Sequence, residues 1–163
     1  MKKLPIGVKF NKHWWLYFKN DPYCNAVCAN SNFLFEDFIY KNIHKYKIQT
    51  EGTTIVDIGA NMGAHTLNFA HFVGDNGKVF AFDPSRLVYY QLCGNVFANG
   101  FPNIYCENVA LGDTNENDSI SVEDLDYFSQ SVNSGNTHVG TFGTHIVPVK
   151  NLDDYDLDNV SLI

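Results

Sequence analysis

The stretch 55–63, with the sequence IVDIGANMG, decides the fold of this 163-residue chain. Its first four residues form an apolar run that carries one acidic residue, Asp57, and glycines follow at positions 59 and 63. A short apolar run bounded by glycines is typical of a strand buried on both faces of a parallel sheet. Glycine lets the backbone turn sharply and approach a ligand closely, which a side chain would prevent. The stretch therefore predicts a strand that ends in a tight, ligand-binding loop.

The segments that follow alternate between helical and strand patterns. Apolar residues recur three apart over residues 64–73, which predicts a helix. The run 78–82 predicts a second buried strand, a second helix follows over about residues 87–98 with Ser85 as its cap, and residues 104–111 predict a third strand. This alternation predicts right-handed crossovers between parallel strands, and hence an α/β fold. We expect a Rossmann-like three-layer αβα sandwich with a mainly parallel central sheet.

The length of the chain predicts a single domain, because 163 residues can bury one core but not two ordinary ones. We expect residues 1–163 to form this one domain. Residues 1–50 are expected to be a helical and aromatic lead-in, and residues 51–163 the cofactor-binding core. Within the lead-in, helical spacing over residues 31–48 predicts a helix. The aromatic cluster in residues 13–18 is expected to cover the sheet or another helix.

The last third of the chain is more polar and less regular. Residues 113–131 contain six carboxylates and no basic residue, which predicts a solvated excursion. Residues 132–145 hold three glycines and two histidines without a clear period, and loops of this length in compact domains are often functional. Residues 145–149 predict another strand, and residues 160–163 begin a further one. We therefore expect a sheet that is incomplete at the C-terminus.

Composition argues against several classes of function. A formal charge of −7 argues against a nucleic-acid partner, because a surface that follows phosphates is basic. The first residues lack the apolar run of a signal peptide or a membrane span, so we expect no membrane partner and a cytoplasmic location. Four cysteines without a secretory signal predict free thiols. No set of four Cys or His ligands has a familiar spacing, so no metal site is predicted.

Three polar residues fall at or near the predicted ends of neighbouring strands: Asp57, Asp83 and Asn108. In an open α/β sheet, ligands bind beyond the carboxyl ends of the strands, near the point where the strand order reverses. Asp83 lies about twenty residues past the glycine loop, where an acidic residue normally accepts hydrogen bonds from both ribose hydroxyls. The three residues therefore predict a cofactor that contains a nucleoside.

The loop itself indicates which nucleoside cofactor is bound. A dinucleotide-binding loop needs a second glycine two residues after the first, and this chain has Asn61 there. The Gly-Lys-Ser/Thr sequence of a phosphate-binding loop is absent. The carboxylate of Asp57 beside the loop suits a ligand with positive charge, such as the ammonium and sulfonium groups of S-adenosylmethionine. These residues favour S-adenosylmethionine, and an NAD-linked oxidoreductase is the weaker alternative.

Five motifs, in the order TIVDIGANMGAHT, VFAFDPS, NVALGD, VNSG and VPVKNLDD, resemble the FkbM family of S-adenosylmethionine-dependent methyltransferases over about residues 33–163. The resemblance implies a class I methyltransferase fold and O-methylation of a sugar or another small-molecule hydroxyl. It also implies the roles of eight residues. The cofactor loop would consist of Asp57, Gly59, Ala60, Asn61 and Gly63, with Asp83 on the ribose and Asn108 and Ala110 near the adenine.

The resemblance has two departures. Family members usually have Glu where this chain has Asp83, so the ribose contact is one methylene shorter. In the family, the strand that begins at Val160 continues into an acidic segment that flanks the reacting centre, whereas this sequence ends at Ile163. We therefore expect a methyltransferase domain that is truncated before its catalytic segment.

The sequence leaves the catalytic residues unknown. Methyl transfer to a hydroxyl is helped by a base, and Asn133, His138 and His145 are candidates because they lie in or beside the loop of residues 132–145. Histidines in surface loops more often have no such role. His65 and Thr66 directly follow the cofactor loop, where a histidine is more often packed or solvated.

We expect the partners to be a small-molecule or glycan acceptor, together with a second copy in a homo-oligomer or a complementing chain. The alternative function is a non-catalytic or split-gene cofactor-binding module that needs a partner to complete its fold.

Overall fold

The computed structural model describes residues 6–10, 12–18, 20–22, 24, 36–113, 119–123, 133–134, 140 and 143–163. Its centre is a sheet with the strand order β5-β4-β3-β9. The strands are β3 (Thr54–Ile58), β4 (Lys78–Phe82), β5 (Ile104–Glu107) and β9 (Val160–Leu162). All three pairings are parallel. Because β3 is followed by β4 and β5 on one side and by β9 on the other, the strand order reverses between β3 and β9.

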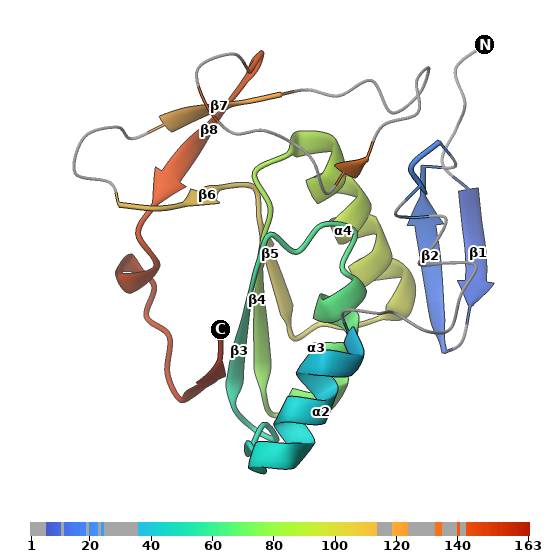
Figure 1. Cartoon of the computed structure of the whole chain (residues 1–163), viewed down its shortest axis with the longest axis vertical. Coiled ribbons are helices and arrows are strands. Elements are labelled where there is room, and N and C mark those ends of the chain that lie inside the picture. Colours follow the sequence, from blue (N-terminus) through green and yellow to red (C-terminus); the bar gives the residue numbers. More distant parts are fainter. Residues whose placement is uncertain are drawn as a thin grey trace.

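Three helices lie together on one side of this sheet (Figure 1): α2 (Glu36–Tyr46), α3 (Ala64–Val73) and α4 (Arg86–Asn99). Ile55 and Val79 point from the sheet into the main core, where they pack against buried residues of the helices such as Leu67 and Leu92. This core stabilises the strands and helices together, because burial of apolar side chains is the main favourable term in folding. The predicted α/β fold with a parallel sheet flanked by helices is confirmed.

The opposite face of the sheet has a smaller core. Val56 and Phe82 are buried there, and partly buried side chains from residues 152–157, around the 3-10 helix η2 (Leu152–Asp154), pack against them. Ile58 is 53% exposed and Tyr105 46% exposed on this face. The second helical layer of the predicted three-layer sandwich is therefore not found among the described residues.

The N-terminal part forms an antiparallel hairpin of β1 (Ile6–Phe10) and β2 (His13–Tyr17), where the sequence predicts a helical and aromatic lead-in. Two asparagines of α4 hold β2 by its backbone. Asn95 accepts a hydrogen bond from the Leu16 N–H at 2.6 Å, and Asn99 both accepts from the Trp14 N–H and donates to its carbonyl, each at 2.7 Å. Trp15 is buried in the main core. The aromatic cluster thus packs against a helix, as expected.

A second sheet with the strand order β6-β8-β7 lies above the carboxyl ends of the central strands, at the top of Figure 1. It consists of β6 (Ala110–Leu111), β7 (Ser119–Val122) and β8 (His145–Lys150). The single strand predicted over residues 104–111 is therefore wrong, because Asn108 and Val109 separate β5 from β6. The excursion predicted over 113–131 also contains a strand, β7, whose alternation of serine with isoleucine and valine fits a half-buried strand.

Candidate cofactor site at the carboxyl edge of the central sheet

The glycine loop after β3 is anchored to the end of the neighbouring strand. The backbone N–H groups of Gly59 and Ala60 both donate to the Phe82 carbonyl, at 2.9 and 3.0 Å. Gly59 has φ of +76° and Asn61 has φ of +51°, so the chain turns through left-handed conformations that favour glycine and tolerate asparagine. A Cβ atom at Gly59 would meet no atom within 4 Å. The loop is thus fixed by β4 and leaves open space beside Gly59.

Gly63, which the sequence predicts to belong to the cofactor loop, packs closely against α4. It has φ of +90°, and a Cβ atom there would lie 2.8 Å from Cδ1 of Leu92. The glycine is therefore needed for close packing of the start of α3 against α4. Asn95, which is fully buried, strengthens the same junction by donating from Nδ2 to the Met62 carbonyl at 2.7 Å. Because Asn95 also accepts the hydrogen bond from the Leu16 N–H, this one side chain holds both the glycine loop and the N-terminal hairpin.

Asp57 lies on the helix-facing side of β3 and is only 8% exposed. One carboxylate oxygen accepts a hydrogen bond from the Thr66 hydroxyl at 2.5 Å. Burial raises the pKa of Asp57, whereas the Thr66 hydrogen bonds and the nearby His65 lower it. Burial likewise lowers the pKa of His65, and the charge of Asp57 opposes that change. Asp57 is therefore a buried carboxylate positioned by the first turn of α3.

Asp83 follows β4 and is 7% exposed. Its two carboxylate oxygens accept hydrogen bonds from the backbone N–H groups of Asn61 and Ser85, each at 2.9 Å. Burial raises the pKa of Asp83 to about 6, and the negative charge of Asp57 adds to the rise, while the two backbone hydrogen bonds lower it. Ser85 is the N-cap residue of α4, as predicted, but its side chain makes no cap hydrogen bond. The Ser85 backbone N–H instead holds the carboxylate.

The two carboxylates make this edge of the sheet electrostatically unfavourable when both are ionised. A charged group buried away from water loses hydration, and a second like charge nearby adds to that cost. The hydrogen bonds to Asp57 and Asp83 reduce the cost, but their donors are the Thr66 hydroxyl and two backbone N–H groups, which carry no charge. A cationic ligand at this edge would therefore bind favourably, because it would neutralise carboxylates that the fold already holds in place.

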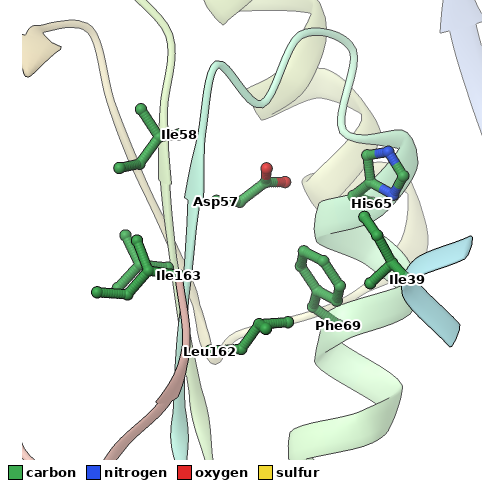
Figure 2. Close-up of a pocket in the computed structure, with 8 residues that line it drawn as sticks. Ile39, Asp57, Ile58, His65, Phe69, Leu162 and Ile163 are labelled. Atoms are coloured by element: carbon green, nitrogen blue, oxygen red, sulfur yellow. The ribbon is translucent and has the colours of Figure 1, made fainter. Parts of the chain in front are cut away.

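A cavity of about 420 Å³ opens at the point where the strand order reverses, between β3 and β9. Figure 2 shows Asp57 pointing from β3 toward α3, with His65 and Phe69 of α3 opposite it. Leu162 of β9 closes the cavity from the other strand. Among the described residues, Nδ1 of His65 is buried without a hydrogen-bond partner. The size, location and single buried carboxylate match the general features of a small-molecule site in an open α/β sheet.

Part of the loop predicted over residues 132–145 reaches the glycine loop after β3. Ser134 is 6% exposed, and its hydroxyl lies 3.0 Å from Oδ1 of Asn61. Its backbone N–H donates to the buried carboxylate of Asp21 at 3.0 Å. Asn133, one of the three candidate catalytic residues, is exposed directly before Ser134. The structure therefore brings residues 133–134 and the N-terminal segment to the loop at Asn61.

The remaining predicted site residues are distributed over several places. Asn108 donates from Nδ2 to the Asp83 carbonyl at 2.8 Å, which fixes the segment after β5 against the end of β4. Ala110 lies in β6, half-buried and paired with Val149 of β8. His145 begins β8 and is paired with Val122, so its described neighbours belong to the second sheet. His138 lies outside the described residues.

Three residues of the site carry no strong signal in the sequence. His65 and Thr66 follow the loop, but only the structure shows that Thr66 holds Asp57 and that His65 lines the cavity. Ser134 lies far from Asn61 along the chain, so no local pattern predicts their contact. Within the described part of the chain, no three His, Cys, Asp or Glu side chains gather as they would around a metal ion. No described helix is long and apolar enough to cross a membrane.

Comparisons with known proteins give structural matches only. No protein-family model matches the chain, and no curated protein does. A SAM-dependent methyltransferase from Aquifex aeolicus is 24% identical with a TM-score of 0.40, over 60% of this chain and 45% of that protein. A SAM-dependent O-methyltransferase from Thermotoga maritima is 21% identical with a TM-score of 0.41, over 49% of this chain and 30% of that protein. Coclaurine N-methyltransferase, bound to N-methylheliamine and SAH, is 21% identical with a TM-score of 0.39, over 49% of this chain and 24% of that protein. This chain spans less than half of the length of each of these proteins.

Proposed function

We propose that this chain binds S-adenosylmethionine at the carboxyl edge of its central sheet and is an S-adenosylmethionine-dependent methyltransferase. The observation that carries the proposal is the pair of buried carboxylates, Asp57 and Asp83, at the ends of the adjacent strands β3 and β4. Both carboxylates are held by hydrogen bonds beside the glycine loop. The strand-order reversal at β3 is where an open α/β sheet binds its ligand.

The residues of this edge fit the chemical groups of the cofactor. S-adenosylmethionine supplies a methyl group on a positively charged sulfur, and it also carries an ammonium group and a ribose. Asp57 would attract the cationic groups, because its carboxylate lines the cavity. Asp83 would take the ribose hydroxyls, since each of its oxygens accepts one backbone hydrogen bond and a carboxylate oxygen can accept two. The open space beside Gly59 leaves room for a ligand against the backbone.

The acceptor in this proposal is a hydroxyl group of a sugar or another small molecule. This part rests on the resemblance of the five sequence motifs to the FkbM family and on the net charge of −7, which disfavours a nucleic acid. The family resemblance also supplies the roles of Asn108 and Ala110 beside the adenine. Among the candidate catalytic residues, Asn133 has the best structural support, because its neighbour Ser134 contacts the cofactor loop at Asn61.

Isothermal titration with S-adenosylmethionine, S-adenosylhomocysteine and NAD tests the cofactor. We expect both sulfur compounds to bind and NAD to bind at least about ten-fold more weakly, a difference of about 1.4 kcal/mol. Asp83→Ala should reduce the affinity for S-adenosylmethionine strongly. Asp75→Ala, at an exposed position in the turn before β4, is the matched control and should leave affinity unchanged. Tighter binding of NAD would overturn the proposal.

The alternative is a cofactor-binding module that needs a partner chain or a second copy. The exposed Ile58 and Tyr105 on the sheet face opposite the helices favour it, because apolar side chains on a sheet face are commonly covered. Sedimentation analysis and methyl-transfer assays with simple sugar acceptors separate the two functions. Cofactor binding without turnover, by a chain that self-associates, would favour the module.

A further inference from the structure

A chain of hydrogen bonds joins a buried carboxylate near the N-terminus to the carboxylate proposed to bind the ribose. Asp21 is fully buried, and its two oxygens accept hydrogen bonds from the backbone N–H groups of Cys24 at 3.2 Å and Ser134 at 3.0 Å. The Ser134 hydroxyl lies 3.0 Å from Oδ1 of Asn61. The Asn61 backbone N–H donates to Oδ2 of Asp83 at 2.9 Å. Residues far apart in the sequence therefore meet at the edge of the sheet where the cofactor would bind.

The donor and the acceptor of the bond between Ser134 and Asn61 follow from the chemistry of the two side chains. Oδ1 of Asn61 also accepts a hydrogen bond from the Met62 N–H at 2.7 Å, so this atom is the carbonyl oxygen of the side chain and not its amide nitrogen. The Ser134 hydroxyl must therefore donate to it. Asp21 accepts from the backbone N–H of Ser134, so the backbone and the hydroxyl of this residue serve different partners.

Asn61 needs support from its side chain because its backbone conformation is strained. It has φ of +51°, a left-handed conformation that is unfavourable for residues other than glycine. The hydrogen bonds that its Oδ1 accepts from Met62 and Ser134 oppose this cost. In the same conformation, the Asn61 N–H donates to Asp83. Ser134 therefore helps to fix the N–H group that orients one oxygen of the Asp83 carboxylate.

We propose that Ser134 is a positioning residue for ribose recognition, which acts through Asn61 on Asp83 and is itself held in place by Asp21. The inference rests on the proposed function, because it needs the ribose of S-adenosylmethionine at Asp83. A carboxylate that binds two ribose hydroxyls must present its oxygens to both at hydrogen-bonding distances and angles, and such bonds weaken steeply when the geometry changes. The groups that orient the carboxylate therefore contribute to its selectivity for the two hydroxyls.

Calorimetric titration of the whole chain with S-adenosylhomocysteine and with its 2′,3′-dideoxy analogue tests the proposal. The wild type should bind S-adenosylhomocysteine at least about one-hundred-fold more tightly than the analogue, because each ribose hydroxyl donates to a charged acceptor. Ser134→Ala should weaken binding of S-adenosylhomocysteine about five-fold and change binding of the analogue by less than about two-fold, so the selectivity falls. Ser119→Ala, at an exposed position of β7, is the matched control and should keep the wild-type selectivity.

Asp21→Asn tests the other end of the network. Asparagine keeps the shape of the side chain but has one acceptor oxygen, so it cannot accept from both the Cys24 and the Ser134 N–H groups. We expect the same direction of change in selectivity as in Ser134→Ala. The double variant should lose little more selectivity than either single variant, because both changes act through one network. Circular dichroism checks that each variant folds, and Asp21→Asn gives a second measurement of selectivity where Ser134→Ala does not fold.

The failure of this proposal can be distinguished from the failure of the proposed function. A wild-type chain that binds neither compound would overturn the proposed function and the positioning role with it. If the wild type binds S-adenosylhomocysteine selectively but Ser134→Ala weakens both ligands by the same factor, Ser134 has only a structural role and the positioning proposal is wrong. Additive losses of selectivity in the double variant would likewise contradict the connection through Asp21.

Discussion

The substitution Asp83→Asn should change how the stability of this protein depends on pH. Burial raises the pKa of Asp83 to about 6 from its ordinary value of 3.8. A carboxyl group with a raised pKa in the folded state stabilises the fold below the unfolded pKa, and this contribution is lost as pH rises through the folded pKa. At 1.36 kcal/mol per pH unit, the wild-type chain loses about 3 kcal/mol between pH 3.8 and pH 6 through this group.

Asparagine has nearly the same shape but does not titrate, so the variant avoids this loss. It keeps one acceptor oxygen, so one of the backbone N–H groups of Asn61 and Ser85 loses its partner, which costs about 1–3 kcal/mol at every pH. We therefore expect the variant to be less stable than the wild type at pH 4. Between pH 4 and pH 8 the free energy of unfolding of the variant, relative to that of the wild type, should rise by about 3 kcal/mol. At pH 8 the variant should therefore be as stable as the wild type or more stable.

Urea unfolding of both chains from pH 4 to pH 8 measures this difference. The slope of the free energy of unfolding against urea concentration should be the same for the two chains. Asp75→Asn, at an exposed position, is the control and should show a flat difference. A pH-independent difference in the free energy of unfolding between Asp83→Asn and the wild type would refute the buried-carboxylate reasoning. So would a wild-type chain that becomes more stable relative to the variant as pH rises. S-adenosylmethionine at about 100 times its dissociation constant should add about 2.7 kcal/mol to the wild type alone.

Five further substitutions test individual contacts. Asp57→Asn should weaken S-adenosylmethionine binding by about ten- to one-hundred-fold in calorimetry while the fold persists, because a charge-assisted contact is lost. Gly63→Ala should lower the free energy of unfolding in urea by about 2 kcal/mol, because its Cβ would lie 2.8 Å from a core leucine. Gly59→Ala should lower the free energy of unfolding by only about 1 kcal/mol, because its Cβ would meet no other atom of the chain. The same Cβ would occupy space proposed for the cofactor, so cofactor affinity should fall. Burial lowers the pKa of His13 to about 4, so its neutral form stabilises the fold above pH 6.5. Up to about 3 kcal/mol of the free energy of unfolding is lost through this group as pH falls toward 4. His13→Phe should remove this pH dependence when unfolding is measured over the acid range. Asn95→Ala should lower the free energy of unfolding in urea by about 2–4 kcal/mol, since it leaves the buried Met62 carbonyl and the partly buried Leu16 N–H without their partner.

Local patterns predicted the centre of the molecule well. The apolar run of β3, the glycine loop, the helices α3 and α4 and the strand β4 all carry strong periodicity or turn signals, and their bounds agree with the prediction to within about one residue. The placement of Asp57 and Asp83 at one edge of the sheet also followed from the sequence, because parallel strands end at the same edge. The predictions failed where the pattern was short or mixed, as in β7 and at the break between β5 and β6.

The sequence by itself determined that a parallel α/β sheet ends in a glycine loop between two acidic strand ends, because backbone geometry and hydrophobic periodicity act over a few residues. Only the tertiary structure decided what surrounds that loop. Thr66 on Asp57 and Ser134 on Asn61 are contacts between residues on different segments of the chain, set by strand register and helix packing. The closeness of such side chains depends on the whole packed core, and no short stretch of sequence contains it.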